Sequence, residues 1–165
     1  MEFFNLGLFN EVKILKNVVY SDDRGFFLEA FNKKKFQETL DMEINFVQDN
    51  HSRSKKGVIR GLHFQREPFA QAKLVRVVKG SILDVVVDIR ANSVNFGKWE
   101  AIELSEKNKL MLFVPEGFAH GFLTIENDSD VIYKTNNFYD PSSDTVLNWN
   151  DTSININWNF NFYGI

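Results

Sequence analysis

The feature that most constrains the fold is a succession of short, strand-like segments rich in Val, Ile, Leu and Phe, with turn residues between them. Helical spacing occurs in one place, residues 33–40, where Phe36 and Leu40 lie four apart and Asn32 can cap the first turn. The pair Lys79-Gly80 predicts a short hairpin. Many short strands with little helix predict an all-β sandwich or barrel, and a jelly roll with a few short helices suits the pattern. The predicted strands are residues 12–19, 25–31, 44–50, 58–65, 72–79, 81–89, 98–104, 109–114, 119–125 and 130–136.

The size and composition suit one globular domain, residues 1–165. A chain of 165 residues can bury a substantial core, and 44% of its residues are hydrophobic. Aromatic residues make up 15% of the chain, and 17 residues are Phe. Flat, bulky side chains in such number favour a sheet-rich core or a stacking pocket over a helical bundle.

Charge and cysteine content argue against several classes of function. The net charge is −3 and no basic block occurs, so no nucleic-acid partner is expected. The chain has no cysteine, which excludes disulfides and thiolate metal sites. The N-terminal residues do not resemble a signal peptide, and the apolar stretches are too short to span a membrane. We therefore expect a cytoplasmic protein with no membrane partner.

Two of the three histidines share an unusual setting. His63 and His120 both lie in apolar strand-like segments, close to Gly61 and Gly121 respectively. An imidazole in apolar surroundings is costly unless it has a partner or a task, and a neighbouring glycine lets a ligand or another backbone approach closely. We interpret His63 and His120 as two walls of one site.

Basic residues near His63 have alternative interpretations. Strict alternation along a strand sends Arg60 and His63 to opposite faces, whereas a bulge at Gly61 turns both inward. Lys73 lies in an apolar run, where a lysine either extends to solvent from an edge strand or faces a cavity. Taken alone, Lys73 favours the edge strand.

Acidic and phenolic groups complete a candidate constellation. Asp84 and Asp88 lie four apart on one face of an apolar strand, and buried carboxylates need cationic or histidine partners. The phenol of Tyr133 can donate a proton. Imidazole, phenol, ammonium and guanidinium around one cavity suggest proton transfer beside a carbonyl, with a cation stabilising the enolate. The partners available to the two carboxylates are His63, Lys73, Arg60 and Arg76.

Motifs for metals and common cofactors are missing from the sequence. The histidines are too dispersed for a metal pair, and no glycine-rich nucleotide-cofactor motif or nucleophile elbow occurs. We expect no metal and no cofactor.

Nine segments of the sequence match the motifs of a known protein family, in the same order along the chain. The chain resembles the dTDP-4-dehydrorhamnose 3,5-epimerases and related nucleotide-sugar epimerases of the cupin fold, over roughly residues 10 to 158. The resemblance implies an isomerase with a double-stranded β-helix fold that acts, without a cofactor, on a dTDP- or GDP-linked 4-keto-6-deoxy sugar. It also implies a homodimer with exchanged N-terminal strands. The matching stretches are residues 23–29, 46–52, 57–65, 71–77, 84–90, 96–99, 114–122, 133–135 and 139–141.

The resemblance also assigns roles to individual residues. It implies that His63 is the base, that Tyr133 is the opposing acid, and that Lys73 lines the enolate region. Arg60 and His120 are implied at the sugar. An aromatic residue beside Arg24, Phe26 or Phe27, is expected to stack on the base, and Arg24 can come from the partner subunit. The implied substrate-binding residues are Arg24, Phe26, Glu29, Gln48, Asn50, Arg60, His120, Tyr139 and Asp144.

Two departures from the family pattern affect the site. After the Ile156-x-Trp158 motif, family members continue to a Lys-Asp pair whose Asp supports the catalytic histidine, whereas residues 159–165 contain no such Asp. Either another group orients His63, with Asp84 as the best candidate and a member of the catalytic residues, or the base is less strongly tuned. The family often carries Glu near Asp144, which is expected to keep that polar contact.

Three functions are compatible with these residues. The first is epimerisation at C3 and C5, or at C3 only, of the 4-keto sugar. The second is a ketoisomerase that moves the carbonyl between C3 and C4. The third is a cupin that binds sugar nucleotides without catalysis. The Arg24, Lys73 and Tyr133 motifs favour the epimerase, which predicts that solvent deuterium enters the sugar.

Overall fold

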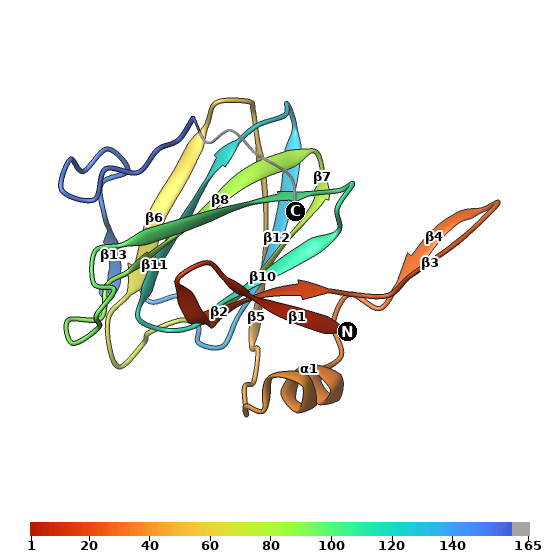
Figure 1. The fold of residues 1–165 in the computed structure, drawn as a ribbon, viewed down its shortest axis with the longest axis horizontal. Coiled ribbons are helices and arrows are strands. Elements are labelled where there is room, and N and C mark those ends of the chain that lie inside the picture. The colour runs from red at the N-terminus through yellow and green to blue at the C-terminus, as the bar shows by residue number, and fades with distance from the viewer. Residues whose placement is uncertain (160–165) are drawn as a thin grey trace.

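Two antiparallel sheets pack face to face in the computed structural model, which describes residues 1–159 (Figure 1). This architecture confirms the all-β jelly roll. The six-stranded sheet has the order β1 (Glu2–Leu6), β2 (Phe9–Lys16), β10 (Leu110–Val114), β7 (Lys73–Lys79), β12 (Ser129–Thr135) and β5 (Gln48–Ser54). The five-stranded sheet has the order β13 (Asp144–Val146), β6 (Ile59–Gln65), β11 (Phe118–Thr124), β8 (Ser81–Asp88) and β9 (Trp99–Ser105).

The main core lies between the two sheets. Inward-facing side chains such as Phe9, Val75, Val86 and Leu112 form one cluster there, each fully or almost fully buried. All eight residues of β8 are buried, because a second apolar cluster covers the outer face of the five-stranded sheet. Strands covered on both faces read as continuous apolar runs rather than alternating ones.

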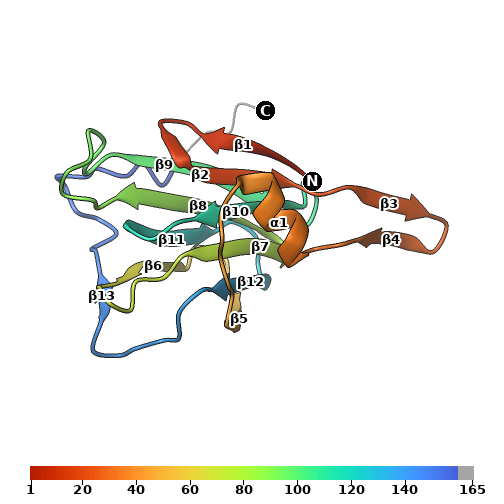
Figure 2. The ribbon, with the colours of Figure 1, turned by 90° about the horizontal axis from the view of Figure 1, so that it is seen from below.

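The helix α1 (Lys33–Leu40) covers the outer face of the six-stranded sheet (Figure 2). It has the predicted bounds, and the side chain of Asn32 accepts a hydrogen bond from the backbone N–H of Lys35 at 3.2 Å, as expected of a cap. Phe36 anchors it against Phe113 of β10, with ring centroids 5.5 Å apart. It is the single helix among residues 1–159, where a few were expected, and it is too short to cross a membrane.

A two-stranded arm extends away from the body in both views (Figures 1 and 2). The arm consists of β3 (Val19–Asp22) and β4 (Gly25–Leu28), which pair only with each other. Its aromatic side chains are largely exposed, with Phe26 at 62% and Phe27 at 66%. Apolar side chains in such a position are unusual for a surface that faces only water.

The predicted hairpin at Gly80 is wrong. β7 and β8 belong to different sheets, and β7 pairs with β10 and β12 instead. Gly80 has a φ of +74°, and its backbone turns the chain from one sheet to the other beside Ser129. The predicted strand 12–19 divides into the end of β2 and the start of β3, and β1 and β13 were not predicted.

An opening between the sheets positions the site. β5 ends the six-stranded sheet, and β6 lies beside β13 at the end of the other. The two strands are linked across the opening, because Arg60 Nε of β6 donates a hydrogen bond to Ser54 Oγ of β5 at 2.8 Å. Side chains from both sheets therefore face one cavity.

Candidate active site

A cavity of about 670 Å³ lies in this opening, between β5, β6, β7, β11 and β12. Its volume suits a small-molecule ligand. A second hollow, of about 620 Å³, lies at the base of the arm, but no histidine or tyrosine lines it. Nine of the predicted site residues line the first cavity: His63, Tyr133, Lys73, Gln48, Asn50, Arg60, His120, Tyr139 and Asp144.

Of the two alternatives for β6, strict alternation or a bulge at Gly61, the structure has the bulge. His63 pairs with His120 and Arg60 pairs with Phe122, so β6 has one residue more than β11 in this span. Gly61 adopts a φ of +117° there, and both Arg60 and His63 line the cavity. Glycine suits this conformation because a side chain is strained at positive φ.

The same bulge brings two glycines into contact. A Cβ atom at Gly61 would lie 2.6 Å from the Cα of Gly121. A Cβ atom at Gly121 would lie 2.6 Å from the carbonyl oxygen of Arg60. Only the absence of both side chains lets β6 and β11 approach this closely, which sets His63 beside His120.

Asp84 contacts His120, so the expectation that Asp84 orients His63 is wrong. The two Asp84 oxygens lie 2.8 and 3.0 Å from His120 Nε2, and the Asp84 side chain is fully buried. The reason is the order of the strands. Asp84 lies on β8, which pairs with β11, the strand of His120, whereas His63 lies on β6, one strand further away.

The carboxylate that approaches His63 belongs to Asp144. Asp144 Oδ1 lies 3.5 Å from His63 Nδ1. β13 brings the two together, because it pairs with β6. His63 has 48% of its side chain exposed against 8% for His120, so His63 is the accessible imidazole. The C-terminal residues 160–165, where the family pattern departs, lie outside the described residues.

Lys73 faces the cavity and does not lie on an edge strand. β7 has neighbours on both sides, and Lys73 Nζ donates a hydrogen bond to the carbonyl oxygen of His63 at 3.2 Å. Burial lowers the pKa of Lys73 to about 8, although the carboxylates of Asp84 and Asp144 act in the opposite direction.

Tyr133 enters the cavity from the sheet opposite His63. It lies on β12, paired with Asn50 of β5. Burial raises the pKa of the Tyr133 phenol, although nearby Arg60 acts to lower it, so the hydroxyl keeps its proton near neutral pH. Gln48 Nε2 donates to Asn50 Oδ1 at 3.0 Å and holds this side of the cavity.

Three predicted substrate-binding residues do not line the cavity of their own chain. Arg24 and Phe26 lie on the arm, and Glu29 follows it. Arg24 forms an exposed ion pair of 2.6 Å with Asp22, and Glu29 pairs with Lys35 at 2.7 Å.

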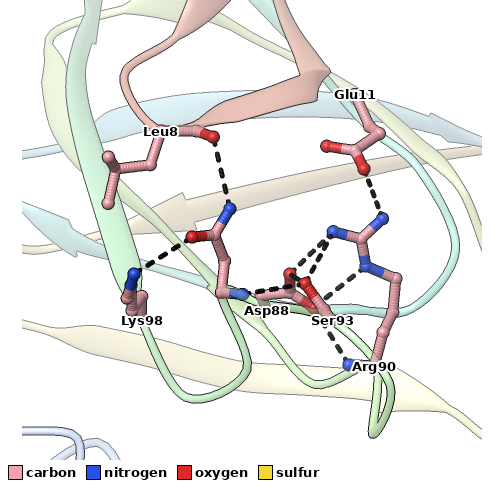
Figure 3. A network of polar contacts seen from close by, with 7 residues as sticks. Leu8, Glu11, Asp88, Arg90, Ser93 and Lys98 are labelled. Carbon is pink, nitrogen blue, oxygen red and sulfur yellow. Dashed lines mark hydrogen bonds and ion pairs between the residues drawn. The ribbon is translucent and has the colours of Figure 1, made fainter.

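Asp88 has its own partners, away from the cavity (Figure 3). Figure 3 shows its carboxylate held by Arg90, whose guanidinium also reaches Glu11 of β2 at 2.6 Å. Ser93 Oγ donates to the same carboxylate at 2.6 Å. The prediction that Asp88 needs a partner is confirmed, but none of the four predicted partners supplies it. This network ties the loop after β8 to β2.

Sequence reasoning missed several cavity residues, among them Ser52 and Phe122. The alternation of β5 signals Ser52, because Gln48 and Asn50 share its face while Asp49 and His51 are exposed on the other. His51, the third histidine, lies outside the cavity, 3.2 Å from Asp130.

The cavity brings together the parts needed for stereochemical inversion beside a ketone. An accessible imidazole and a protonated phenol come from opposite sheets, and the buried Lys73 lines the same cavity. General acid–base groups of this kind typically accelerate a reaction 10²–10⁴-fold each.

Comparisons with known proteins agree with this chemistry. A family model described as dTDP-4-dehydrorhamnose 3,5-epimerase matches residues 8–163. Enzymes of that name from Shigella flexneri and Escherichia coli are 53% and 54% identical over 148 residues, which is 90% of this chain and 82% and 80% of theirs.

The similarity extends to solved structures that contain a bound sugar nucleotide. A dTDP-6-deoxy-D-glucose-3,5-epimerase from Legionella pneumophila, in complex with dTDP-4-keto-L-rhamnose, superposes with a TM-score of 0.91 at 43% identity. That match covers 95% of this chain and 82% of the other. A 3′-monoepimerase from Streptomyces bikiniensis in complex with dTDP-quinovose has a TM-score of 0.86 at 28% identity, over 94% and 77% of the two chains.

Proposed function

The chain belongs to the dTDP-4-dehydrorhamnose 3,5-epimerase family, and on that premise we propose that it epimerises a dTDP-linked 4-keto-6-deoxy sugar without a cofactor. The observation that carries the proposal is the pairing of an accessible His63 with a protonated Tyr133 from the opposite sheet, across one cavity. Identity above 50% to 3,5-epimerases supports inversion at both C3 and C5.

The reaction begins with His63. Its imidazole removes the proton from a carbon adjacent to the C4 ketone, and the C–H electron pair moves into an enolate. The ammonium of Lys73 stabilises the negative enolate oxygen. Tyr133 then gives its proton to the same carbon from the opposite face, so the centre is inverted. Exchange with solvent returns the imidazolium and the phenolate to their starting states.

We also propose that the active form is a homodimer with exchanged N-terminal strands, in which the arm completes the partner's cavity. Arg24 and Phe26 are exposed on an arm that extends away from its own body. A second copy of the chain supplies a surface that covers the apolar side chains, and Arg24 adds a further cation to that copy's cavity. Such an arrangement follows two-fold symmetry.

Proton exchange in heavy water tests the reaction. Incubation with dTDP-4-keto-6-deoxyglucose should place deuterium at C3 and C5 of the sugar, read by NMR. Deuterium at C3 alone selects the C3-only epimerase, and a carbonyl moved to C3 selects the ketoisomerase. Binding of dTDP without any exchange would mean that the chain is a non-catalytic cupin.

A further inference from the structure

The side chain of Gln65 is a buried polar group in the cavity wall that the proposed reaction does not use. Gln65 is only 6% exposed and lies at the end of β6, two residues beyond His63. Because side chains two apart on a strand share a face, Gln65 lines the same cavity as the base. A buried carboxamide is costly without hydrogen-bond partners, so its partners indicate what it does.

Both N–H groups of this amide are donated to the backbone. Gln65 Nε2 donates to the carbonyl oxygen of Phe69 at 2.7 Å and to that of Phe138 at 3.2 Å. Gln65 Oε1 accepts the backbone N–H of Asp140 at 2.9 Å. A reversed amide would set its oxygen against two carbonyl oxygens, so these partners fix its orientation. With both donors occupied, the amide is suited to holding loops and not to donating to a substrate.

The bond to Asp140 fixes the start of a tight turn that leads into β13. The carbonyl oxygen of Asp140 accepts the N–H groups of Ser143 and Asp144, at 3.2 and 3.1 Å. Asp140 Oδ1 also accepts the Ser143 N–H, at 2.9 Å. The end of the turn meets Gln65 again, because Asp144 pairs with Gln65 where β13 lies beside β6. One residue of β6 therefore holds both ends of the turn.

This turn sets the position of the carboxylate beside the base. Asp144 is its last residue, and Asp144 Oδ1 lies 3.5 Å from His63 Nδ1. The strand that Asp144 begins has three residues, so its own pairing holds the carboxylate only weakly. Tyr139 has a separate anchor, because its N–H donates to Gln48 Oε1 at 3.0 Å. Loss of the Gln65 amide should therefore displace Asp144 more than Tyr139.

We propose that Gln65 is a positioning residue for the reaction, which acts by holding the turn that sets Asp144 against His63. This assignment rests on the proposed function, because it takes His63 to be the base and Asp144 to stabilise its imidazolium. The amide acts on the rate without touching the substrate. A carboxylate that moves away from the imidazolium stabilises it less, because the Coulomb energy falls with distance.

Gln65→Met tests the assignment, because it removes all three hydrogen bonds and keeps an unbranched side chain. It should lower kcat roughly three- to tenfold, less than complete loss of the Asp144 carboxylate. The dissociation constant of dTDP, measured by calorimetry, should stay within about twofold of wild type. Gln37→Met is the matched control. Gln37 Nε2 donates to the carbonyl oxygen of Ile44 at 3.1 Å, outside the cavity, so its loss should leave kcat unchanged.

Asp140→Ala loosens the same turn without altering β6, and it carries the test if Gln65→Met does not fold. It removes the Oδ1 atom that accepts the Ser143 N–H, so kcat should fall as in Gln65→Met. Asp140→Asn keeps an oxygen at this position and should retain most of the wild-type rate.

A double-mutant cycle with Asp144→Asn separates positioning from a general structural role. If Gln65 acts through Asp144, Gln65→Met should lower kcat by less than about twofold once residue 144 is Asn. The same holds for Asp140→Ala. Losses of kcat that multiply in the double variants would overturn the assignment.

Three other results would also overturn the assignment: unchanged kcat in Gln65→Met, unchanged kcat in Asp144→Asn, or weakened dTDP binding with unchanged kcat in Gln65→Met. A wild type that takes up no deuterium into the sugar contradicts the proposed function itself. Wild-type uptake of deuterium with multiplying losses in the cycle contradicts only the Gln65 assignment.

Discussion

At the scale of single residues, the two cavity histidines differ in their carboxylates. His120 is buried and contacts Asp84 through both carboxylate oxygens, whereas His63 is half exposed and has Asp144 at 3.5 Å. A buried and tightly held imidazole is suited to fixing the geometry of a site. The accessible imidazole is suited to taking a proton from substrate.

Replacing Asp144 tests which role that residue has. A carboxylate near His63 Nδ1 stabilises the imidazolium formed when His63 takes a proton, so Asp144→Asn should lower kcat roughly 10- to 100-fold with little change in KM. Asp144→Glu should recover part of the rate. A raised KM with unchanged kcat would instead assign Asp144 to substrate binding, as the family resemblance implies.

The pH profile tests the charge of Lys73. Its pKa of about 8 lies below the ordinary lysine value of 10.5, so the ammonium is lost as the pH rises through about 8. We expect kcat/KM to fall on the alkaline side near that pH. Because Asp84 raises the pKa of Lys73, Asp84→Asn should move this fall to lower pH. A shift to higher pH, or none, would contradict the role of the Lys73 ammonium.

At the scale of elements, local patterns could be predicted and long-range pairing could not. The helix 33–40 and its Asn32 cap follow from spacing and cap chemistry, and both are present. The hairpin at Gly80 is wrong because a turn residue marks a reversal without saying which sheet the next strand joins. β1, with exposed residues, and β13, with three residues, carry too little apolar pattern to be recognised.

Because long-range strand pairing could not be predicted, the partners of Asp84 and His63 in the site were not predicted correctly. The alternative of a bulge at Gly61 followed from a glycine between two polar residues of one strand, which is local information. The partner of Asp84 depends on the order β6, β11, β8, which no segment of sequence states alone. The partner of His63 depends on β13, which the sequence did not reveal.

The close approach of Gly61 and Gly121 predicts that one added methyl group destabilises the protein. Gly121→Ala should push β11 away from the Arg60 carbonyl, at a cost of about 1–3 kcal/mol, and lower the melting temperature by roughly 3–10 °C. kcat/KM should fall as His63 moves from His120. Gly97→Ala is the control, because no atom lies within 4 Å of the added methyl, although its φ of +76° carries some strain. Unchanged activity in Gly121→Ala would show that the close approach of the strands is not needed.

At the scale of the whole molecule, the proposed active site is built from two chains, because the arm of one chain completes the cavity of its partner. Arg24→Ala removes an arm residue, and His63→Asn removes the base from the cavity. If the arm serves the partner's cavity, mixing the two inactive variants forms mixed dimers with one intact site. Activity should then return to about a quarter of wild type after subunit exchange. No recovery, with subunit exchange verified by mass, would place the arm at its own cavity.

The central claim is that His63 and Tyr133 act on opposite faces of the same carbon. The most direct measurement is deuterium uptake together with product configuration, by NMR in heavy water, for His63→Asn and Tyr133→Phe. His63→Asn should show neither uptake nor inversion. Tyr133→Phe should still take up deuterium through His63 but return mostly uninverted sugar. Inversion at the wild-type rate in either variant, or loss of uptake with Tyr133→Phe alone, would contradict the account.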